Sequence, residues 1–344
     1  MPRVQLAPLT TLRLGGPAAR LVEAPDAGAL VAAVAGADAA GEPVLVLAGG
    51  SNVVVADTGF PGTVVRVTSR GVARRTGEHG RVLLDVEAGE PWDPFVAATV
   101  AEGLSGVEAL SGIPGSVGAT PIQNVGAYGQ EVAETITAVH AYDRRARELV
   151  DLDPAACHFG YRTSRFKREA GRWVVLRVTF ELEPGGLSRP VRYAELARTL
   201  GVAVGERAPV GAVRDAVLGL RRGKGMVLDD ADPDTRSAGS FFTNPVLDAP
   251  LPGAPAWEQD DGRVKTSAAW LIEHAGFTRG YGDPDGIAIS SKHTLALTNR
   301  GAGTATQLVA LAQEIAGGVR ERFGVELVPE PVFVGHAWPA SGGQ

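Results

Sequence analysis

Short apolar runs and one helical stretch alternate in the first part of the chain. An Ala/Val-rich helix is predicted to begin at Pro25-Asp26 and to end at Gly41, because a cap residue opens it and a glycine closes it. A buried strand is predicted over 44–47, and a second apolar strand over 63–67. The first 68 residues are therefore expected to form a β-α-β-β unit.

The middle of the chain is predicted to contain two strands, one helix and a glycine-rich segment. One strand covers 82–87, and the helix after it has Asp93-Pro94 as N-cap and first residue, with Gly103 as its terminator. Residues 110–129 are rich in glycine. Over 173–183 the alternation predicts a long strand with one wetter face, whose other face carries Val174, Leu176, Val178, Phe180 and Leu182.

Two helices and a loop are predicted after residue 200. The first helix covers 209–222, because valines and leucines recur there at helical spacing, and Gly223 lies past its end. Residues 226–236 are predicted to be a polar loop. Ser267 is expected to cap a short helix that ends at Gly276.

The last predicted helix runs from Thr304 to Phe323, and Gly324 ends it. Its apolar face carries Leu308, Leu311, Ile315, Val319 and Phe323. The residues after Gly335 are expected to be disordered. Helices and strands in mixed order, with hairpin-like runs, favour an α+β fold or mixed α/β domains.

Length and charge narrow the class of protein. The chain has 344 residues, of which 44% are hydrophobic, so two or three domains with sizeable cores are expected. The net charge of −6 disfavours nucleic acid or an anionic membrane as a main partner. Cys157 is the one cysteine, which excludes an internal disulfide and fits a reducing cytosol. Without an apolar leader or an apolar stretch near 20 residues, a cytoplasmic protein is expected.

Several common catalytic and cofactor motifs are absent from the sequence. It contains no Gly-x-Gly-x-x-Gly, no Walker A pattern and no His-Glu-x-x-His. It also lacks the Gly-x-Ser-x-Gly nucleophile elbow, and its six histidines show no metal-ligand spacing. Hydrolysis by a metal or by an elbow serine is therefore disfavoured, and no metal site is predicted.

Two glycine-rich segments are candidates for binding a phosphate. Residues 48–52 directly follow a strand, and their backbone N–H groups could bind a phosphate, although an ordinary tight turn remains an alternative. In residues 111–129, backbone N–H groups with Ser116, Gln123 and Asn124 could bind a diphosphate and a heterocycle. A flexible linker is the alternative here, but the segment is too apolar for one.

Two further segments combine polar and aromatic side chains. Residues 161–167 carry three cations and two aromatic rings, which suit an anionic ligand, although a solvated run of charges explains them equally well. In residues 239–245, the hydroxyl of Ser240 could donate a proton if it is buried against a reacting carbon. The alternative is that Ser240 is a cap or turn residue.

Together these segments resemble the UDP-N-acetylenolpyruvoylglucosamine reductase family, flavoenzymes of peptidoglycan precursor synthesis. The resemblance runs from Thr11 to Gly335, and its most specific pieces are 113–118, 121–129, 159–167 and 238–245. It implies an α+β protein with a two-part FAD-binding module of the PCMH/vanillyl-alcohol-oxidase type and a C-terminal α/β substrate-binding domain. The implied boundaries are 1–68 and 69–204 for the FAD-binding subdomains, 205–330 for the substrate-binding domain and 331–344 for a tail.

The resemblance also implies how the cofactor is held. Related oxidases of this fold often attach FAD through a histidine, but only His79 precedes His140 here, and it lies outside the glycine-rich loops. Noncovalent FAD is therefore expected, with NADPH as co-substrate. The implied FAD contacts are Gly49, Gly50, Ser51, Asn52, Val53, Ile113, Pro114, Gly115, Gly118, Gln123, Asn124, Gly126, Ala127 and Tyr128.

The implied reaction is a two-step hydride relay. NADPH reduces FAD and leaves, and flavin N5 then passes hydride to the enolpyruvyl group of UDP-N-acetylglucosamine enolpyruvate, which yields UDP-N-acetylmuramate. By resemblance, Ser240 protonates the adjacent carbon, while Arg162 and Glu330 stabilise the charge on the substrate carboxyl group. The implied substrate contacts are Tyr161, Tyr193, Lys224 and Asn244, of which Tyr193 and Lys224 bind the diphosphate.

One position departs from the family pattern, and two other functions stay open. The family usually has Val-Arg after its glutamate, whereas Pro331-Val332 follows Glu330 here, so a neighbouring cation is missing. The first alternative is an FAD-dependent oxidase of the same fold, which air would reoxidise rapidly. The second is a non-catalytic UDP-sugar-binding protein, which would show no substrate-dependent loss of NADPH. A monomer is expected in each case.

Overall fold

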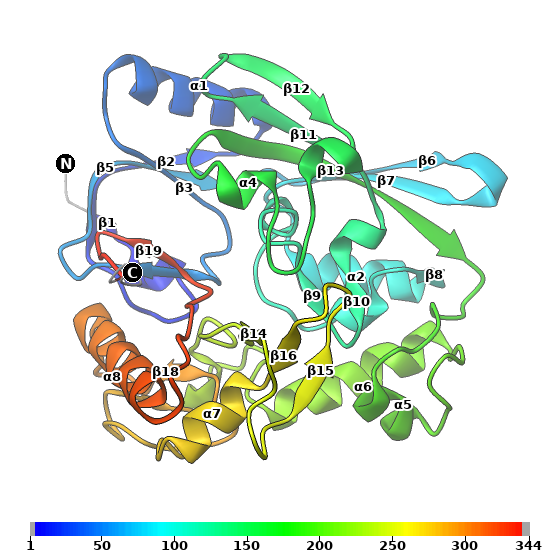
Figure 1. Ribbon diagram of the computed structural model, residues 1–344. Helices are drawn as coiled ribbons and strands as arrows, with labels where there is room; N and C mark the ends of the chain where they lie inside the picture. Colours follow the sequence, from blue (N-terminus) through cyan, green and yellow to red (C-terminus); the bar gives the residue numbers. More distant parts are fainter. Residues whose placement is uncertain (1–3, 339–344) are drawn as a thin grey trace. The chain divides into compact units, whose positions relative to one another are not determined.

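The structure is a computed structural model, and it describes residues 4–338 (Figure 1). Contacts within the chain divide it into two compact units. Unit 1 contains the described residues of 4–18, 50–60 and 223–338, and unit 2 contains 19–49 and 61–222. The three-domain division with boundaries at 68 and 204 stays a prediction.

Unit 2 contains a six-stranded antiparallel sheet in the order β12-β11-β13-β7-β6, with β8 pairing to the last residues of β13 (Figure 1). The long alternating strand predicted over 173–183 is confirmed as β13, which lies in the middle of this sheet. The strands are β6 (Val72–Thr76), β7 (Val82–Glu87), β8 (Leu104–Ser105), β11 (Ile136–Asp143), β12 (Glu148–Leu152) and β13 (Trp173–Pro184).

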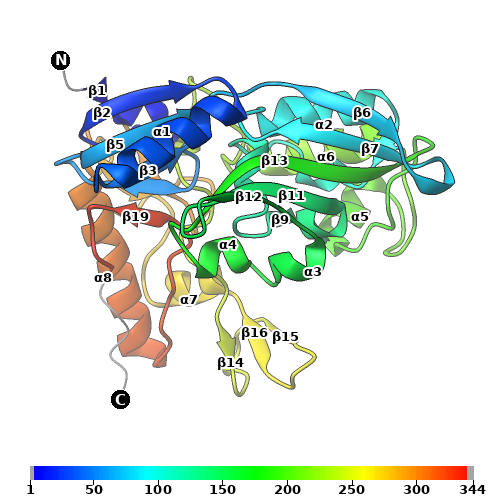
Figure 2. The ribbon, with the colours of Figure 1, turned by 90° about the horizontal axis from the view of Figure 1, so that it is seen from above.

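A second sheet brings β2 (Pro17–Ala24), β5 (Phe60–Val67) and β3 (Val44–Leu47) together in that order, with β3 and β5 parallel. The helix between β2 and β3 is α1 (Ala27–Ala39), which lies against β3 and β13 (Figure 2). Asp26 caps α1 by accepting a hydrogen bond from the N–H of Ala29 at 2.8 Å. The predicted N-terminal helix and its two following strands are therefore confirmed.

The remaining elements of unit 2 are short or peripheral. The helices are α2 (Trp92–Ala101), α3 (Pro154–Cys157), α4 (Arg165–Arg168), α5 (Ala194–Leu200) and α6 (Val210–Gly223). The 3₁₀ turns are η2 (Glu78–Gly80), η3 (Glu108–Leu110), η4 (Val117–Ala119) and η5 (Val132–Glu134), and β9 (Gly126–Ala127) pairs with β10 (Gln130–Glu131). The main core packs Trp92, Phe95 and Phe180 with ring centroids 5.3 to 6.0 Å apart. Helix α6 matches its prediction, except that Gly223 is its last residue.

The prediction that Asp93 caps helix α2 is wrong. The cap position is Pro91, and Asp93 is the second residue of the helix. Its carboxylate accepts hydrogen bonds from the backbone N–H of Gly112 and from Arg214 instead of from its own helix. These partners are distant in the chain, so local sequence rules could not identify them.

Unit 1 combines both ends of the described chain. Its strands are β1 (Val4–Gln5), β4 (Val53–Val55), β14 (Val246–Leu247), β15 (Ala256–Glu258), β16 (Val264–Thr266), β17 (Ile287–Ile289), β18 (Leu297–Asn299) and β19 (Val332–Val334). Its helices are α7 (Ala268–His274) and α8 (Ala305–Phe323), with 3₁₀ turns η1 (Ala7–Leu9) and η6 (Pro233–Thr235). The core packs α8 and α7 against β17, β18 and the buried rings of Phe241 and Phe242.

Helix α8 confirms the prediction for 304–323. The side chain of Thr304 caps it, and four of the five residues on the predicted apolar face are buried, with Phe323 partly buried. Asp57 adds a second cap from another part of the chain. Its carboxylate accepts hydrogen bonds from the N–H groups of Ala305 at 2.8 Å and Thr306 at 2.9 Å.

Residues 332–334, which the sequence analysis placed in a tail, form strand β19. It pairs in parallel with β4, with Val332, Phe333 and Val334 opposite Val53, Val54 and Val55. The expected disorder after Gly335 concerns a segment of which 339–344 lie outside the described residues.

An ion pair at the end of β11 makes stability depend on pH. The carboxylate of Asp143 is 2% exposed and accepts hydrogen bonds from Arg172 and from the N–H of Arg145 at 2.9 Å. The hydrogen bonds from Arg172, which outweigh burial, lower the pKa of Asp143 to about 2.

We expect Asp143→Asn to lower the free energy of unfolding by about 2 kcal/mol at pH 7. Because the folded-state pKa is depressed, this contribution is fully present above the unfolded-state value of about 4 and is lost as the pH falls through about 2. Urea unfolding of both proteins should therefore show a difference that shrinks below about pH 4. Asp261→Asn is the control, because its pair with Arg263 is about half exposed, and a pH-independent difference for Asp143→Asn would contradict the prediction.

Candidate active site

The predicted site residues lie in both units, and each unit brings its own set together. Unit 2 holds Gly49, Ile113, Pro114, Gly115, Gly118, Gln123, Asn124, Gly126, Ala127, Tyr128, Tyr161, Arg162 and Tyr193. Unit 1 holds Gly50, Ser51, Asn52, Val53, Lys224, Ser240, Asn244 and Glu330. No group of His, Cys, Asp or Glu among residues 4–338 is arranged to hold a metal ion.

The two glycine-rich segments of unit 2 approach each other closely. A Cβ atom added to Gly49 would lie 2.6 Å from the Cα of Gly115, and one added to Gly118 would lie 2.5 Å from the Cβ of Ala88. Gly115 also has a φ of +120°, which side chains rarely tolerate. Only glycine fits at these positions, and the loops after β3 and before η4 therefore form one surface.

Backbone hydrogen bonds of the 115–118 loop decide which N–H groups remain for a ligand. The N–H of Val117 donates to the carbonyl of Glu90 at 2.9 Å, and that of Gly118 donates to Ala88 at 2.8 Å. Within residues 4–338, no acceptor pairs with the N–H of Gly115 or Ser116. Gly118 therefore contributes space to the loop, while Gly115 and Ser116 present donors.

Ser116 supplies a test of whether this loop fits a phosphate-bearing cofactor. The residue is 4% exposed, and its buried hydroxyl oxygen has no hydrogen-bond partner among the described residues. A buried polar group without a partner costs free energy, so such groups are rare unless a ligand satisfies them. The free hydroxyl next to two free N–H groups fits a diphosphate such as that of FAD.

Asn124 joins this loop to the segment that carries Arg162. Its amide nitrogen donates to the carbonyl of Gly160 at 3.1 Å and to Glu131 at 2.6 Å, and its oxygen accepts from the N–H of Ala133 at 3.1 Å. The side chain is 1% exposed and is occupied by these three contacts. Asn124 therefore holds the loop in place.

Arg162 lies against the same loop. One guanidinium nitrogen donates to the carbonyl of Gly126 at 2.7 Å, and the group stands 5.6 Å from the ring centroid of Tyr161. A Cβ atom on Gly126 would come within 3.0 Å of the guanidinium. Arg162 has a φ of 52°, in the left-handed region that costs a non-glycine residue roughly 1–2 kcal/mol. The surrounding contacts therefore hold this arginine in a defined place.

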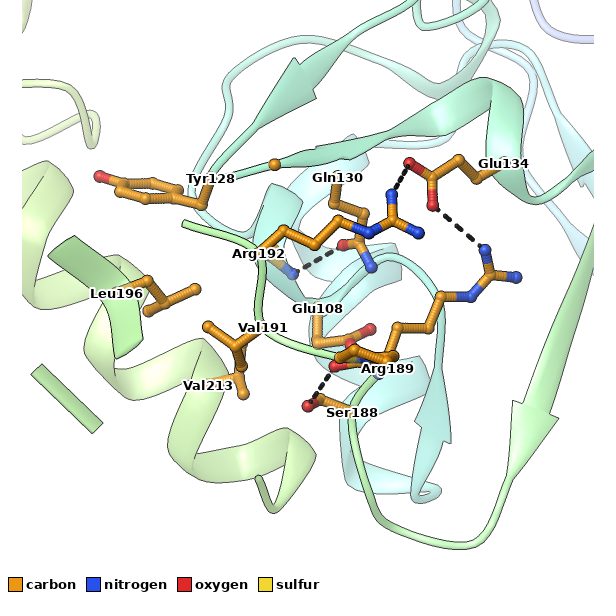
Figure 3. Close-up of a pocket in the computed structure, with 13 residues that line it drawn as sticks. Glu108, Tyr128, Gln130, Glu134, Ser188, Arg189, Val191, Arg192, Leu196 and Val213 are labelled. Carbon is orange, nitrogen blue, oxygen red and sulfur yellow. Dashed lines mark hydrogen bonds and ion pairs between the residues drawn. The ribbon is translucent and has the colours of Figure 1, made fainter. Parts of the chain in front are cut away.

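Tyr193 meets the loop from the other side. Its ring packs edge-on against Tyr128 with centroids 5.6 Å apart, and 45% of the residue is exposed. A small pocket lies beside this pair, and Figure 3 shows Arg189 and Arg192 both directed at Glu134, with distances of 3.3 and 3.1 Å. Sequence reasoning missed this arginine pair, because its carboxylate partner is more than 50 residues away in the chain.

In unit 1, backbone pairing brings Ser240 and Glu330 into adjacent segments. The N–H of Glu330 donates to the carbonyl of Phe241 at 2.8 Å, and the N–H of Phe241 donates to Leu295 at 2.7 Å. The side chain of Asn52 donates to the carbonyl of Glu330 at 3.3 Å. Residues 51–53, 240–241 and 330 therefore lie together, although they are distant in the sequence.

The other predicted residues of unit 1 lie in turns. Gly50 must be glycine, because a Cβ there would lie 2.0 Å from the carbonyl oxygen of Leu9. Lys224 directly follows α6 and precedes Gly225, which adopts a φ of +65°. The side-chain oxygen of Asn244 accepts a hydrogen bond from the N–H of Ala268, the first residue of α7, at 3.0 Å. Asn244 thus has a structural contact of its own.

Comparison with known proteins gives matches over most of the chain. Residues 232–334 match the family model for the UDP-N-acetylenolpyruvoylglucosamine reductase C-terminal domain, and residues 18–150 match an FAD binding domain. A UDP-N-acetylenolpyruvoylglucosamine reductase of Thermobifida fusca is 56% identical over 347 residues, which cover 96% of this chain and 97% of the relative. One of Streptomyces coelicolor is 58% identical over 348 residues, with 96% and 89% covered.

A solved structure is similar over nearly the whole length. The UDP-N-acetylenolpyruvylglucosamine reductase of Thermus caldophilus has a TM-score of 0.67 and 26% identity, with 97% of this chain and 98% of that chain covered. These matches confirm the predicted α+β fold with its FAD-binding module, and they confirm FAD as the cofactor. The chain belongs to the UDP-N-acetylenolpyruvoylglucosamine reductase family.

Proposed function

We propose that Ser240 donates the proton in this protein's reaction, while Arg162 and Glu330 stabilise the charge that develops on the substrate carboxyl group. As a family member, the protein is an NADPH-dependent oxidoreductase that reduces the enolpyruvyl group of UDP-N-acetylglucosamine enolpyruvate to UDP-N-acetylmuramate in peptidoglycan precursor synthesis. The observation that carries the assignment is the backbone pairing of Glu330 with Phe241, at 2.8 Å, which sets the glutamate next to Ser240.

The glycine-rich surface around Gly49 and Gly115 would hold the cofactor. Bound FAD supplies the hydride chemistry, from NADPH to the terminal carbon of the enolpyruvyl group. The hydroxyl of Ser116 and the N–H groups of Gly115 and Ser116 would donate hydrogen bonds to the diphosphate. The close approach of Gly49 to Gly115 brings the loop that contains Gly50, Ser51 and Asn52 to the same region of the sequence-predicted site.

Ser240 suits the role of acid because the adjacent carbon becomes carbanion-like once hydride has reached the terminal carbon. A carbanion is basic enough to take a proton from a hydroxyl group that is held close to it. The rings of Phe241 and Phe242, which are 1% and 2% exposed, pack beneath this segment and hold its backbone. Ser240 would give its proton to that carbon and recover it from solvent.

Arg162 and Glu330 would act on the substrate carboxyl group in different ways. The guanidinium group carries a fixed charge and can donate two parallel hydrogen bonds to a carboxylate. Glu330 can stabilise the developing charge only when it is protonated or shares a proton. Pro331-Val332 after it brings no cation that would favour its ionised form.

For the remainder of the substrate, we propose that Tyr193 and Lys224 bind the diphosphate. The exposed hydroxyphenyl ring of Tyr193 is oriented by its edge contact with Tyr128, and Lys224 contributes a point charge. Tyr161 and Asn244 would contact the substrate as well. The substrate-binding domain would comprise 205–330, after FAD-binding subdomains over 1–68 and 69–204.

We also propose that the protein is a cytoplasmic monomer without nucleic-acid or membrane partners. Cys157 is buried, and burial raises its pKa to about 12, so the thiol stays protonated and unreactive. The net charge of −6 gives no electrostatic attraction to nucleic acid. Among the helices within residues 4–338, none has the length and apolar character that crossing a membrane requires.

The purified protein should be yellow, and acid should release its flavin as free FAD, because no histidine lies in the glycine-rich loops. NADPH should bleach the flavin, and added UDP-N-acetylglucosamine enolpyruvate should restore the colour under anaerobic conditions. An absorbance spectrum recorded after each addition checks all three steps.

Three outcomes of this experiment would overturn parts of the proposal. Flavin that stays with the denatured polypeptide would contradict noncovalent binding. Rapid recovery of colour in air without substrate would favour an oxidase. Binding of the substrate without any loss of NADPH would favour a UDP-sugar-binding protein that has no catalytic activity.

A further inference from the structure

An ion pair ties the proposed cofactor loop to helix α6. The carboxylate of Asp93 accepts hydrogen bonds from the backbone N–H of Gly112 at 2.6 Å and from two guanidinium nitrogens of Arg214 at 2.7 and 2.9 Å. Gly112 opens the segment that leads to Gly115 and Ser116. One carboxylate thus joins the start of this loop to a helix more than 100 residues later in the chain.

The pair has the geometry of a strong contact. Arg214 is bound through both terminal nitrogens, and the side chains of Arg214 and Asp93 are 16% and 32% exposed. Burial alone would raise the pKa of Asp93, but the hydrogen bonds from Arg214 and Gly112 outweigh it and lower that pKa. Bidentate charged hydrogen bonds of this kind fix orientation as well as distance.

The neighbouring residue holds the same loop at two further points. The indole N–H of Trp92 donates to the carbonyl of Leu110 at 3.0 Å, and its backbone N–H donates to the carbonyl of Gly115 at 3.1 Å. The first turn of α2 therefore carries the loop from Leu110 to Gly115. Of these contacts, only the one through Asp93 extends to another helix.

Helix α6 places a second arginine toward the other end of the glycine-rich segment. Arg221 lies seven residues after Arg214, hence on the same face of the helix, and it is 9% exposed. Its charge interacts with Tyr128 and Asp93. Helix α6 therefore contacts the segment near Gly112, where it begins, and near Tyr128, where it ends.

We propose that Asp93 and Arg214 are positioning residues for FAD, because their ion pair fixes Gly112 and thereby the donors of Gly115 and Ser116. This inference rests on the proposed role of the 113–118 loop in holding the diphosphate. Neither side chain is expected to touch the cofactor. The pair acts through the backbone of the loop, and its loss should weaken FAD binding more than it destabilises the fold.

The test is the affinity of the apoprotein for FAD, measured by the quenching of flavin fluorescence. Asp93→Ala removes both contacts and should raise the Kd about tenfold or more. Asp93→Asn and Arg214→Met each remove the ion pair but keep an acceptor for Gly112, so each should raise the Kd by a smaller factor. The double variant Asp93→Asn with Arg214→Met should be no weaker than the worse single variant, because both act on one contact.

Asp38→Ala is the matched control. Asp38 forms a similarly buried two-point ion pair with Arg144, with exposures of 24% and 19%, and it joins α1 to the end of β11 in the same unit. This variant should lower the melting temperature of the apoprotein about as much as Asp93→Ala while leaving the Kd for FAD unchanged. An equal rise in Kd for both variants would mean that the effect is general destabilisation, and it would overturn the inference.

Gly115→Ala separates this inference from the proposed cofactor site. If Gly115→Ala leaves the Kd unchanged, the loop does not hold FAD and the proposed site itself fails. If Gly115→Ala weakens FAD binding and Asp93→Ala does not, the site stands and the positioning role of Asp93 and Arg214 is overturned. Weakening by both, with Asp38→Ala unaffected, supports the inference.

Discussion

Ser240→Ala is expected to leave the reduction of the flavin by NADPH near its native rate and to slow the reduction of the substrate by about 10²–10⁴-fold. The variant removes one hydroxyl group, while the buried rings of Phe241 and Phe242 can still pack, so the fold and FAD binding should survive. Only the second half-reaction forms a carbanion-like carbon that needs a positioned acid.

Rapid-mixing absorbance can follow the two half-reactions separately. Ser240→Cys is a useful second variant, because a thiol of similar size should restore part of the lost activity if proton donation is the role. Ser237→Ala is the matched control, because the hydroxyl of Ser237 lies in the same segment and only accepts a hydrogen bond from the N–H of Gly239 at 3.2 Å. Equal slowing of both half-reactions by Ser240→Ala would mean that Ser240 is a turn residue.

Arg162→Lys is expected to lose about 2–4 kcal/mol of transition-state stabilisation, although the charge is retained. A planar guanidinium group can hold a carboxylate by two parallel hydrogen bonds, and an ammonium group cannot. The structure adds a second reason, because Arg162 uses one nitrogen to bind the carbonyl of Gly126 at 2.7 Å and has others to offer. Lysine cannot make both contacts at once in this geometry.

Steady-state kinetics with substrate measure this loss as a fall in kcat/KM. Arg165→Lys is the control, because Arg165 lies in the same segment and pairs with Glu169 at 3.3 Å. That exchange should leave kcat/KM near its native value. Turnover close to native for Arg162→Lys would show that Arg162 is a surface cation without a role in the reaction.

Local patterns predicted those parts of the fold that depend on local rules. The alternation over 173–183 identified β13, and the capping threonine with a regular apolar face identified α8. Asp93 was misplaced because its partners, Gly112 and Arg214, are distant in the chain. The pairing of β19 with β4 was missed for the same reason, since three residues carry no period and their partner lies almost 280 residues earlier.

The candidate site divides in a similar way. Glycine-rich loops and the segments around Arg162 and Ser240 are visible in the sequence, because each is a continuous run of unusual composition. What the sequence could not supply is the use of each donor. The structure shows that the N–H of Gly118 is already bound, whereas the hydroxyl of Ser116 has no partner among the described residues. Such assignments depend on packing between distant segments.

Because β19 pairs with β4, the two sites of synthesis that build unit 1 are separated in time. On the ribosome, all of unit 2 has been made once residue 222 is added, whereas Val53, Val54 and Val55 must wait for residues 332–334. A chain that stops short of β19 leaves these three valines, which are buried in the finished protein, without their partner strand. Incomplete chains therefore expose an apolar strand edge that chaperones and proteases can recognise, and Glu330 takes its place only as synthesis nears its end.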